Sequence, residues 1–144
     1  SLNSAQVLRI ISGISLNEVP RSGVARKIMP QKPYYNIIRS LENACEVFGK
    51  GKVSSNIIIG LGESEEEILK TVVLLAQIGT VATLYPFDPI EGIQTPFKRP
   101  NKELLCKLAI EHKKILESYS IDPLNLETMC CACAASHIYP GRDL

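Results

Sequence analysis

Apolar and polar positions follow two different periods along the chain, and these periods alternate. The stretch VLRIISGISLNEV (residues 7–19) is rich in β-branched residues and ends in polar ones, which predicts a strand. The stretch YYNIIRSLENACEVFGKGK then places apolar side chains at helical spacing until Gly49 and Gly51 end it. This predicted helical stripe consists of Ile37, Ile38, Leu41, Ala44, Cys45 and Phe48.

A second strand and a second helix follow. VSSNIIIGLG (residues 53–62) is a short, mainly β-branched run stopped by glycines, which is typical of a parallel strand buried on both faces. In SEEEILKTVVLLAQIG, Ser64 and Glu67 have capping-box spacing and three acids load the first turn, so a helix is predicted that ends at Gly79. Its predicted inward face consists of Ile68, Val72, Leu75 and Ala76.

The same order then repeats. TVATLYPF predicts a third strand, residues 88–100 form a loop rich in Pro and Gly, and Asn101 is the expected N-cap of a helix with the sequence KELLCKLAIEHKKILESY. His112 falls on the apolar stripe of this helix, so we expect a core histidine with its hydrogen bonds satisfied. The other side chains expected to face inward are Leu104, Leu108, Ile115 and Tyr119.

Strands that alternate with helices through short connections predict an α/β fold with one parallel sheet. Three such strands make either the second half of a barrel or a small open sheet. Ligands of parallel sheets gather beyond the carboxyl ends of the strands. These ends carry the segments SLNEVPR, GLGES and YPFDPIEG, so we expect the functional site there, with Asp88 and Glu91 either beside a substrate or capping turns.

Composition and charge narrow the classes of function. The chain has 144 residues, 45% of them hydrophobic, which is enough for one domain with a core. Its 16 Lys and Arg nearly balance 15 Asp and Glu, so no charged field for nucleic acid or an anionic membrane is visible. No apolar run reaches the roughly 18 residues of a membrane-spanning helix. The sequence also lacks the charged segment followed by an apolar segment that is typical of a signal peptide. We expect a cytoplasmic protein that binds neither nucleic acid nor membrane.

The five cysteines fall into two groups. Cys45 and Cys106 lie in helical patterns and are expected to be buried thiols. Cys130, Cys131 and Cys133 crowd together near the end of the chain, where disulfide geometry disfavours pairing between neighbours. Metal or redox chemistry is therefore indicated for this second group.

The spacing of Cys130 and Cys133 allows two thiolates to bind one metal, and the same step along the chain reaches Ser136. Cys131 and His137 are further available ligands. An iron–sulfur cluster, a structural zinc, thiol redox exchange and inert cysteines all remain open on this evidence.

The segment VSSNIIIGLGESEEE resembles the fifth strand and following turn of radical S-adenosylmethionine enzymes, whose pattern there is Gly-x-Ile-x-Gly-x-x-Glu. The matching positions are Asn56, Ile58, Gly60 and Glu63, and Asn56 replaces the first glycine. ISLNEVPR resembles the end of the fourth strand, and GTVATLYPFDPIEG resembles the sixth strand with its substrate-side loop. The resemblance covers nearly the whole chain and is greatest to the biotin synthase and lipoyl synthase branch.

This resemblance implies the C-terminal half of a partial (β/α)6 TIM barrel. Strands four to six would occupy residues 1–100, and a helix with a Cys-rich tail would occupy residues 101–144. The residues implied to contact S-adenosyl-L-methionine are Asn17, Glu18, Asn56, Ile58, Gly60, Gly62 and Glu63. On their own chemistry, Gly60 and Gly62 would also suit a plain turn, and Glu63 would bond backbone donors of neighbouring turns.

One family feature is absent. The chain has no Cys-x-x-x-Cys-x-x-Cys, the motif that holds the radical-generating [4Fe-4S] cluster, and the family places it before the region matched here. We therefore expect the C-terminal half of a longer enzyme, with a degenerate relative as the alternative, and no cleavage of S-adenosylmethionine by this chain alone. The arginine of biotin synthases corresponds to Ile37, which leaves Arg39, out of register, as a candidate carboxylate partner.

In lipoyl synthases a serine near the C-terminus is a ligand of an auxiliary, sulfur-donating cluster. The resemblance thus implies an auxiliary [4Fe-4S] cluster bound by Cys130, Cys131, Cys133 and Ser136. The implied reaction is sulfur insertion into an unactivated C–H bond of a small-molecule or carrier-bound substrate. Ferredoxin or flavodoxin would donate electrons, and an N-terminal half or partner subunit would complete the enzyme. The alternative is a non-catalytic subunit or scaffold that binds iron–sulfur or zinc through its C-terminal cysteines.

Overall fold

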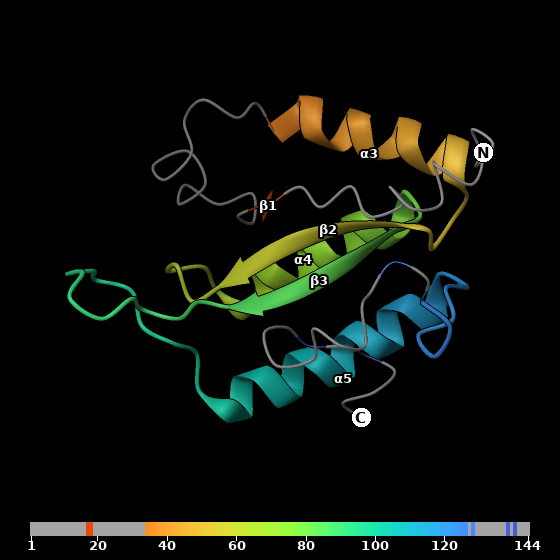
Figure 1. Cartoon of the computed structure of the whole chain (residues 1–144). Coiled ribbons are helices and arrows are strands. Elements are labelled where there is room, and N and C mark those ends of the chain that lie inside the picture. Colours follow the sequence, from red (N-terminus) through yellow and green to blue (C-terminus); the bar gives the residue numbers. More distant parts are fainter. Residues whose placement is uncertain (1–16, 19–33, 127, 129–137, 139, 141–144) are drawn as a thin grey trace, which may run out of the picture.

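The computed structural model describes residues 17–18, 34–126, 128, 138 and 140 (Figure 1). Strands and helices alternate along this part of the chain, as the apolar periods predict. In chain order the elements are β1 (Asn17–Glu18), α3 (Tyr34–Phe48), β2 (Val53–Ile59), α4 (Glu65–Gln77), β3 (Thr80–Pro86) and α5 (Lys102–Ser118).

The strands form one parallel sheet in the order β1-β2-β3, which confirms the α/β fold class. Asn17 of β1 pairs with Asn56 of β2, and Asn56 in turn pairs with Thr83 of β3. The β2–β3 pairing continues past the strand ends, because Phe87 N–H donates to the Ile59 carbonyl at 2.7 Å. The carboxyl ends of β2 and β3 therefore lie side by side.

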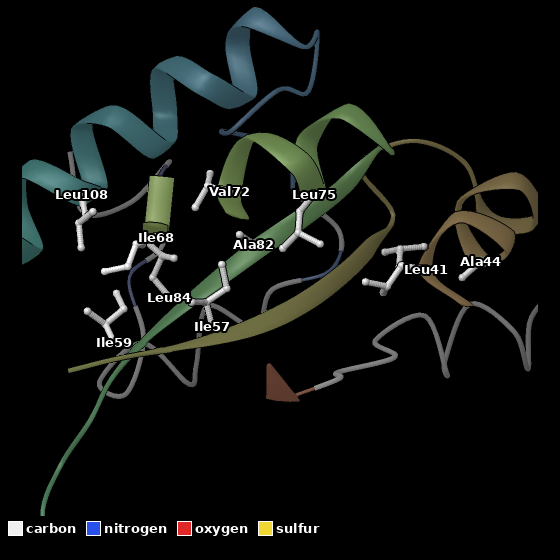
Figure 2. Close-up of a cluster of buried hydrophobic side chains, with 11 residues drawn as sticks. Leu41, Ala44, Ile57, Ile59, Ile68, Val72, Leu75, Ala82, Leu84 and Leu108 are labelled. Carbon is white, nitrogen blue, oxygen red and sulfur yellow. The ribbon is translucent and has the colours of Figure 1, made fainter. Parts of the chain in front are cut away.

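One face of the sheet packs against the helices. Alternate residues of β2 and β3 join apolar side chains of α3, α4 and α5 in a single core (Figure 2). The strand residues of this core are Val53, Ile57, Ile59, Ala82 and Leu84, and the buried helix residues are Leu41, Ala44, Ile68, Val72, Leu75 and Leu108. A second cluster, made of Ala76, Val81, Leu116, Ile121 and Leu126, joins the ends of α4 and α5 to the chain after α5.

Helix α4 begins as its sequence predicts. The Ser64 hydroxyl accepts from Glu67 N–H at 3.2 Å, and the Glu67 carboxylate accepts from Ser64 N–H at 2.8 Å, which completes the capping box. The four predicted inward residues of α4 are all buried. The local sequence was sufficient here because the cap and the apolar stripe both lie within one element.

Helix α5 differs from its prediction in which residues are buried. Asn101 is the N-cap, with its side chain accepting from Leu104 N–H at 2.8 Å, as expected. The fully buried face is Leu108, Ala109, His112 and Leu116, whereas Leu104, Ile115 and Tyr119 are only half-buried. The prediction of a buried Cys106 is wrong, since its side chain is exposed. Two residues before Leu108, Cys106 lies about 200° around the helix from that buried position.

Among the described residues, no helix is both long enough and apolar enough to cross a membrane.

Candidate functional site

The turn after β2 is held by a carboxylate. Both Glu63 carboxylate oxygens accept backbone hydrogen bonds, one from Gly60 N–H and the other from Leu61 N–H at 2.8 Å. The turn thus points two successive N–H groups at one acidic side chain just before α4 begins. The prediction that Glu63 bonds backbone donors of a neighbouring turn is confirmed.

Gly60 is required by the approach of another segment of this chain. Its φ is +107°, and a Cβ added there would lie 2.7 Å from the Lys98 carbonyl oxygen and 3.0 Å from Pro100 Cδ. Any other side chain at this position would collide with the backbone that leads into α5. The glycine pattern of the turn therefore has one structural cause that needs no ligand.

The loop between β3 and α5 extends beyond the carboxyl ends of β2 and β3 (Figure 1). The rings of Phe87 and Phe97 meet edge to face at its base, with centroids 6.0 Å apart. Asp88 forms an exposed ion pair with Arg99 at 3.2 Å, which ties the two ends of the loop together. Asp88 thus has a structural partner that the sequence pattern did not reveal.

The face of the sheet opposite the main core carries mostly polar side chains. Since strand residues alternate between faces, the residues between the core positions belong to this second face. We call this set the polar face, and its described members are Ser54, Asn56, Ile58, Val81, Thr83 and Tyr85, of which Val81 packs in the second cluster. Ser54 and Thr83 are each 4% exposed, and Asn56 and Tyr85 are half-buried. Hydroxyl, amide and phenol groups beside one isoleucine can hydrogen-bond and pack against a ligand with polar edges and an apolar face.

The sheet brings some predicted site residues together and separates others. Asn17 shares a register row with Asn56 on the polar face, whereas Glu18 pairs with Ile57, a core position. Asn17 and Asn56 are therefore neighbours in the sheet, and Glu18 occupies the alternate row. Sequence reasoning missed Thr83 and Tyr85, because only the β2–β3 register aligns them with Asn56 and Ile58.

Gly62 and Glu91, also predicted to lie at the carboxyl edge, are exposed there. Gly62 has a φ of +98° and lies between the buried Leu61 and the half-buried Glu63. Neither residue approaches the core. They belong to the solvent side of the turn and of the long loop.

Arg39 lies near the amino ends of the strands, opposite the carboxyl ends. It lines an open hollow together with Glu42, Cys45, Lys50 and Gly79, and the last two come just before β2 and β3 begin. Arg39 is therefore distant from the carboxyl edge at which a substrate carboxylate is expected.

Cys45, in the same hollow, is half-buried, so its predicted burial is confirmed only in part. Its sulfur lies 3.2 Å from the Thr80 hydroxyl. Burial raises the pKa of the Cys45 thiol, with Glu42 adding to the effect and the Thr80 contact opposing it. This thiol is therefore a weak nucleophile near neutral pH.

His112 is in the core as predicted, but its hydrogen bonds are not satisfied by any of the described residues. The side chain is 0% exposed, and neither Nδ1 nor Nε2 has a partner in the described part of the chain. Burial lowers the pKa of the imidazole to about 3, so the ring is neutral at physiological pH. The His112 side chain is therefore a buried, neutral imidazole rather than a cation.

The predicted metal ligands Cys130, Cys131, Cys133 and Ser136 lie outside the described residues. Within the described residues, no group of three or more His, Cys, Asp or Glu side chains is arranged to hold a metal ion. The described residues on either side of the cysteines are Thr128 and Ile138. Ile138 N–H donates to the Leu84 carbonyl at 2.9 Å in an antiparallel bridge on β3.

Comparison with protein-family models, with curated proteins and with solved structures gives no match to this chain.

Proposed function

We propose that this chain is the S-adenosylmethionine-binding half of a radical S-adenosylmethionine enzyme that inserts sulfur into an unactivated C–H bond. Its parallel strands would be the fourth to sixth strands of a partial barrel. A segment outside this chain would carry the radical-generating cluster, because the Cys-x-x-x-Cys-x-x-Cys motif is absent here. The proposal is carried by the turn from Gly60 to Glu63 beside the polar face.

The turn supports the proposal through what it fixes at the carboxyl end of β2. Glu63 engages the N–H groups of Gly60 and Leu61, so the strand end is rigid before α4 begins. Because Lys98 and Pro100 cover Gly60, a flat ligand would approach the backbone of this turn at the exposed Gly62. Glu63 would therefore position the turn rather than take part in proton transfer.

The polar face supplies the chemistry that a nucleoside requires. Asn56 and Thr83 are neighbours across β2 and β3, and Ile58 and Tyr85 come next in register toward the carboxyl ends. Amide and hydroxyl groups can bond the ribose and base edges, while the isoleucine side chain contacts the purine face. The ligand when bound would supply the radical precursor, and these residues would orient it.

The tail cysteines would hold the auxiliary [4Fe-4S] cluster that donates sulfur. Cys130 is two residues from Thr128, and Cys133 is five residues from both Thr128 and Ile138. Ile138, which follows the cysteines along the chain, is bonded to Leu84, two residues before β3 ends.

Binding of S-adenosylmethionine tests the first half of the proposal. Isothermal titration of the chain should show binding that Asn56→Leu weakens by at least about tenfold, or about 1.4 kcal/mol. Arg39→Gln, at the opposite edge of the sheet, is the matched control and should bind like the wild type. A wild-type Kd weaker than about 1 mM, a binding free energy of only about −4 kcal/mol, would contradict the proposal.

Anaerobic reconstitution with iron and sulfide tests the second half. We expect about four irons and about four sulfides per chain and a broad absorption band near 400 nm, as for a thiolate-bound cluster. Cys133→Ala should abolish the cluster, and Cys106→Ala, at an exposed position on α5, should not. Zinc bound without a chromophore would instead favour the non-catalytic scaffold.

A further inference from the structure

The loop between β3 and α5 is long and has no regular secondary structure. Residues 87–101 separate the two elements and include neither a helix nor a strand. Ordered loops longer than about 12–15 residues are uncommon in compact domains, and those that occur are usually functional. Figure 1 shows this loop extending past the carboxyl ends of β2 and β3. The packing of the described domain gives such a projection no role.

The base of the loop is held in place, whereas its tip is free of the rest of the described chain. The rings of Phe87 and Phe97 meet edge to face, and Asp88 pairs with Arg99 at 3.2 Å. At the tip, a Cβ added to Gly92 would meet nothing within 4 Å. The loop is therefore a structured projection rather than a segment packed on the domain.

The tip presents two isoleucines to water side by side. Ile93 N–H donates to the Ile90 carbonyl at 3.1 Å, which closes a β-turn whose third residue, Gly92, has a φ of +85°. The first and fourth Cα atoms of a β-turn lie less than about 7 Å apart, so the two side chains are neighbours. Ile90 is 69% exposed and Ile93 is 61% exposed. Adjacent apolar side chains exposed to this extent are typical of a contact surface.

The same loop also has a hollow that can receive such a tip. Its walls combine apolar rings and side chains with an amide and a hydroxyl, and they consist of Pro89, Ile93, Gln94, Thr95, Pro96 and Phe97. The hollow is open to solvent, so it cannot enclose a small molecule as a ligand pocket does. Because the tip and the hollow belong to one loop, two copies of the loop complement each other when a two-fold axis relates them.

The charges of the loop are self-complementary in the same way. Glu91, in the turn at the tip, and Lys98, near the base, are both exposed, and neither is in an ion pair within the described chain. If two loops lie antiparallel, the tip of one is beside the base of the other. Each Glu91 then faces the partner's Lys98, and the two-fold axis makes this pair occur twice.

From these observations we propose that residues 89–98 form a two-fold interface between two copies of this chain. The isoleucines at the tip of each loop contact the hollow of the other loop, and Glu91 pairs with the partner's Lys98. An acid between the two isoleucines disfavours an anionic membrane as the alternative occupant. The proposal does not depend on the proposed function, because it uses no residue of the polar face and no metal.

Sedimentation equilibrium of the wild-type chain from about 10 µM to about 1 mM tests the proposal. A reductant is present, so that the exposed Cys106 forms no disulfide between copies. A loop of this length offers less than the roughly 800 Å² per partner of a standard interface, so we expect a reversible dimer with a Kd on the order of 100 µM. In ¹⁵N-labelled chain, the amide signals of Ile90, Glu91 and Ile93 should shift over the same concentrations.

Aspartates at the tip test the apolar contact. The double variant Ile90→Asp, Ile93→Asp should weaken dimerisation by more than about tenfold, because each interface buries these side chains twice. Leu124→Asp is the matched control, since Leu124 is 65% exposed on the chain after α5, and it should dimerise like the wild type. Circular dichroism verifies that each variant is folded.

Charge reversal tests the antiparallel arrangement. Glu91→Lys or Lys98→Glu alone should weaken dimerisation by at least about fivefold, because two attractive pairs become two repulsive ones. The two reversals combined should restore the wild-type Kd to within about twofold, because the opposite charges face each other again. Glu117→Lys, an exposed charge near the end of α5, is the control and should leave the Kd unchanged.

Four results would overturn the proposal. The first is a chain that stays monomeric up to about 1 mM, and the second is a dimer that the aspartates at the tip leave intact. The third is a pair of charge reversals that does not recover the affinity lost by each alone. The fourth is a monomer that binds phosphatidylcholine vesicles through Ile90 and Ile93, which would assign the tip to a membrane. S-adenosylmethionine titration is a separate measurement, so this proposal and the proposed function fail independently.

Discussion

The buried neutral His112 makes the stability of this protein depend on pH. In the folded chain its pKa is about 3, whereas an unperturbed histidine has a pKa of 6.5. As the pH falls below 6.5 the unfolded chain gains a proton that the folded chain does not bind. The free energy of unfolding therefore falls with pH below 6.5 and levels off only near pH 3.

The size of this effect follows from the two pKa values. At about 1.4 kcal/mol per pH unit, lowering the pH from 8 to 5 should reduce the free energy of unfolding by about 2 kcal/mol. The full difference between the two pKa values corresponds to about 5 kcal/mol, as large as the whole stability of a weakly stable domain. The chain should therefore remain folded at pH 5 and unfold in acid before the imidazole of the folded state protonates.

Urea unfolding between pH 5 and pH 8, with a chelator present, measures this dependence. His112→Leu, which keeps an apolar side chain of similar size, should lose most of it, and His137→Gln should retain it. Hydrogen bonds from Lys70 to Glu66, and from the Asn125 side chain and Leu124 N–H to Asp122, lower the pKa values of these two carboxyls, so both stay ionised over this interval. An equal slope in wild type and His112→Leu, or an imidazole signal of His112 that titrates near pH 6.5, would refute the reasoning.

Three further expectations concern the turns and the thiols. Gly60→Ala should lower the free energy of unfolding by at least about 2 kcal/mol through left-handed strain and collision with the loop backbone. The control is Gly92→Ala, because Gly92 has a φ of +85° and open space around it, so this variant adds the strain alone. Equal losses of stability in the two variants would exclude the collision. Ser64→Ala should cost about 1 kcal/mol by removing the N-cap of α4, measured by urea unfolding, and an unchanged midpoint would contradict the capping box. In the folded chain, iodoacetamide at pH 8 should alkylate exposed Cys106 faster than half-buried Cys45, whose pKa is raised; peptide mass mapping would disprove this if Cys45 reacted first.

The sequence alone was sufficient for the elements and for much of their order. Helix α4 could be predicted with its cap and its buried face, because Ser64, Glu67 and the apolar stripe interact within a few residues of one another. The parallel pairing of β2 could be predicted from its β-branched run, since only a strand covered on both faces tolerates such a sequence. The carboxylate role of Glu63 could be predicted because its partners are two and three residues away.

Features that join distant segments were decided by the tertiary structure. The pairing of Asn56 with Thr83 depends on the register of two strands, and a shift of one residue would have put Thr83 among the helices instead. The need for glycine at position 60 comes from a loop almost forty residues later that packs against it. The burial of the His112 imidazole and the exposure of Cys106 depend on the rotation of α5 against its neighbours, which the mixed apolar pattern of that helix leaves unspecified. Local hydrogen bonds and apolar periods are encoded within a few residues, whereas the candidate site is built from contacts whose partners are chosen only when the elements pack.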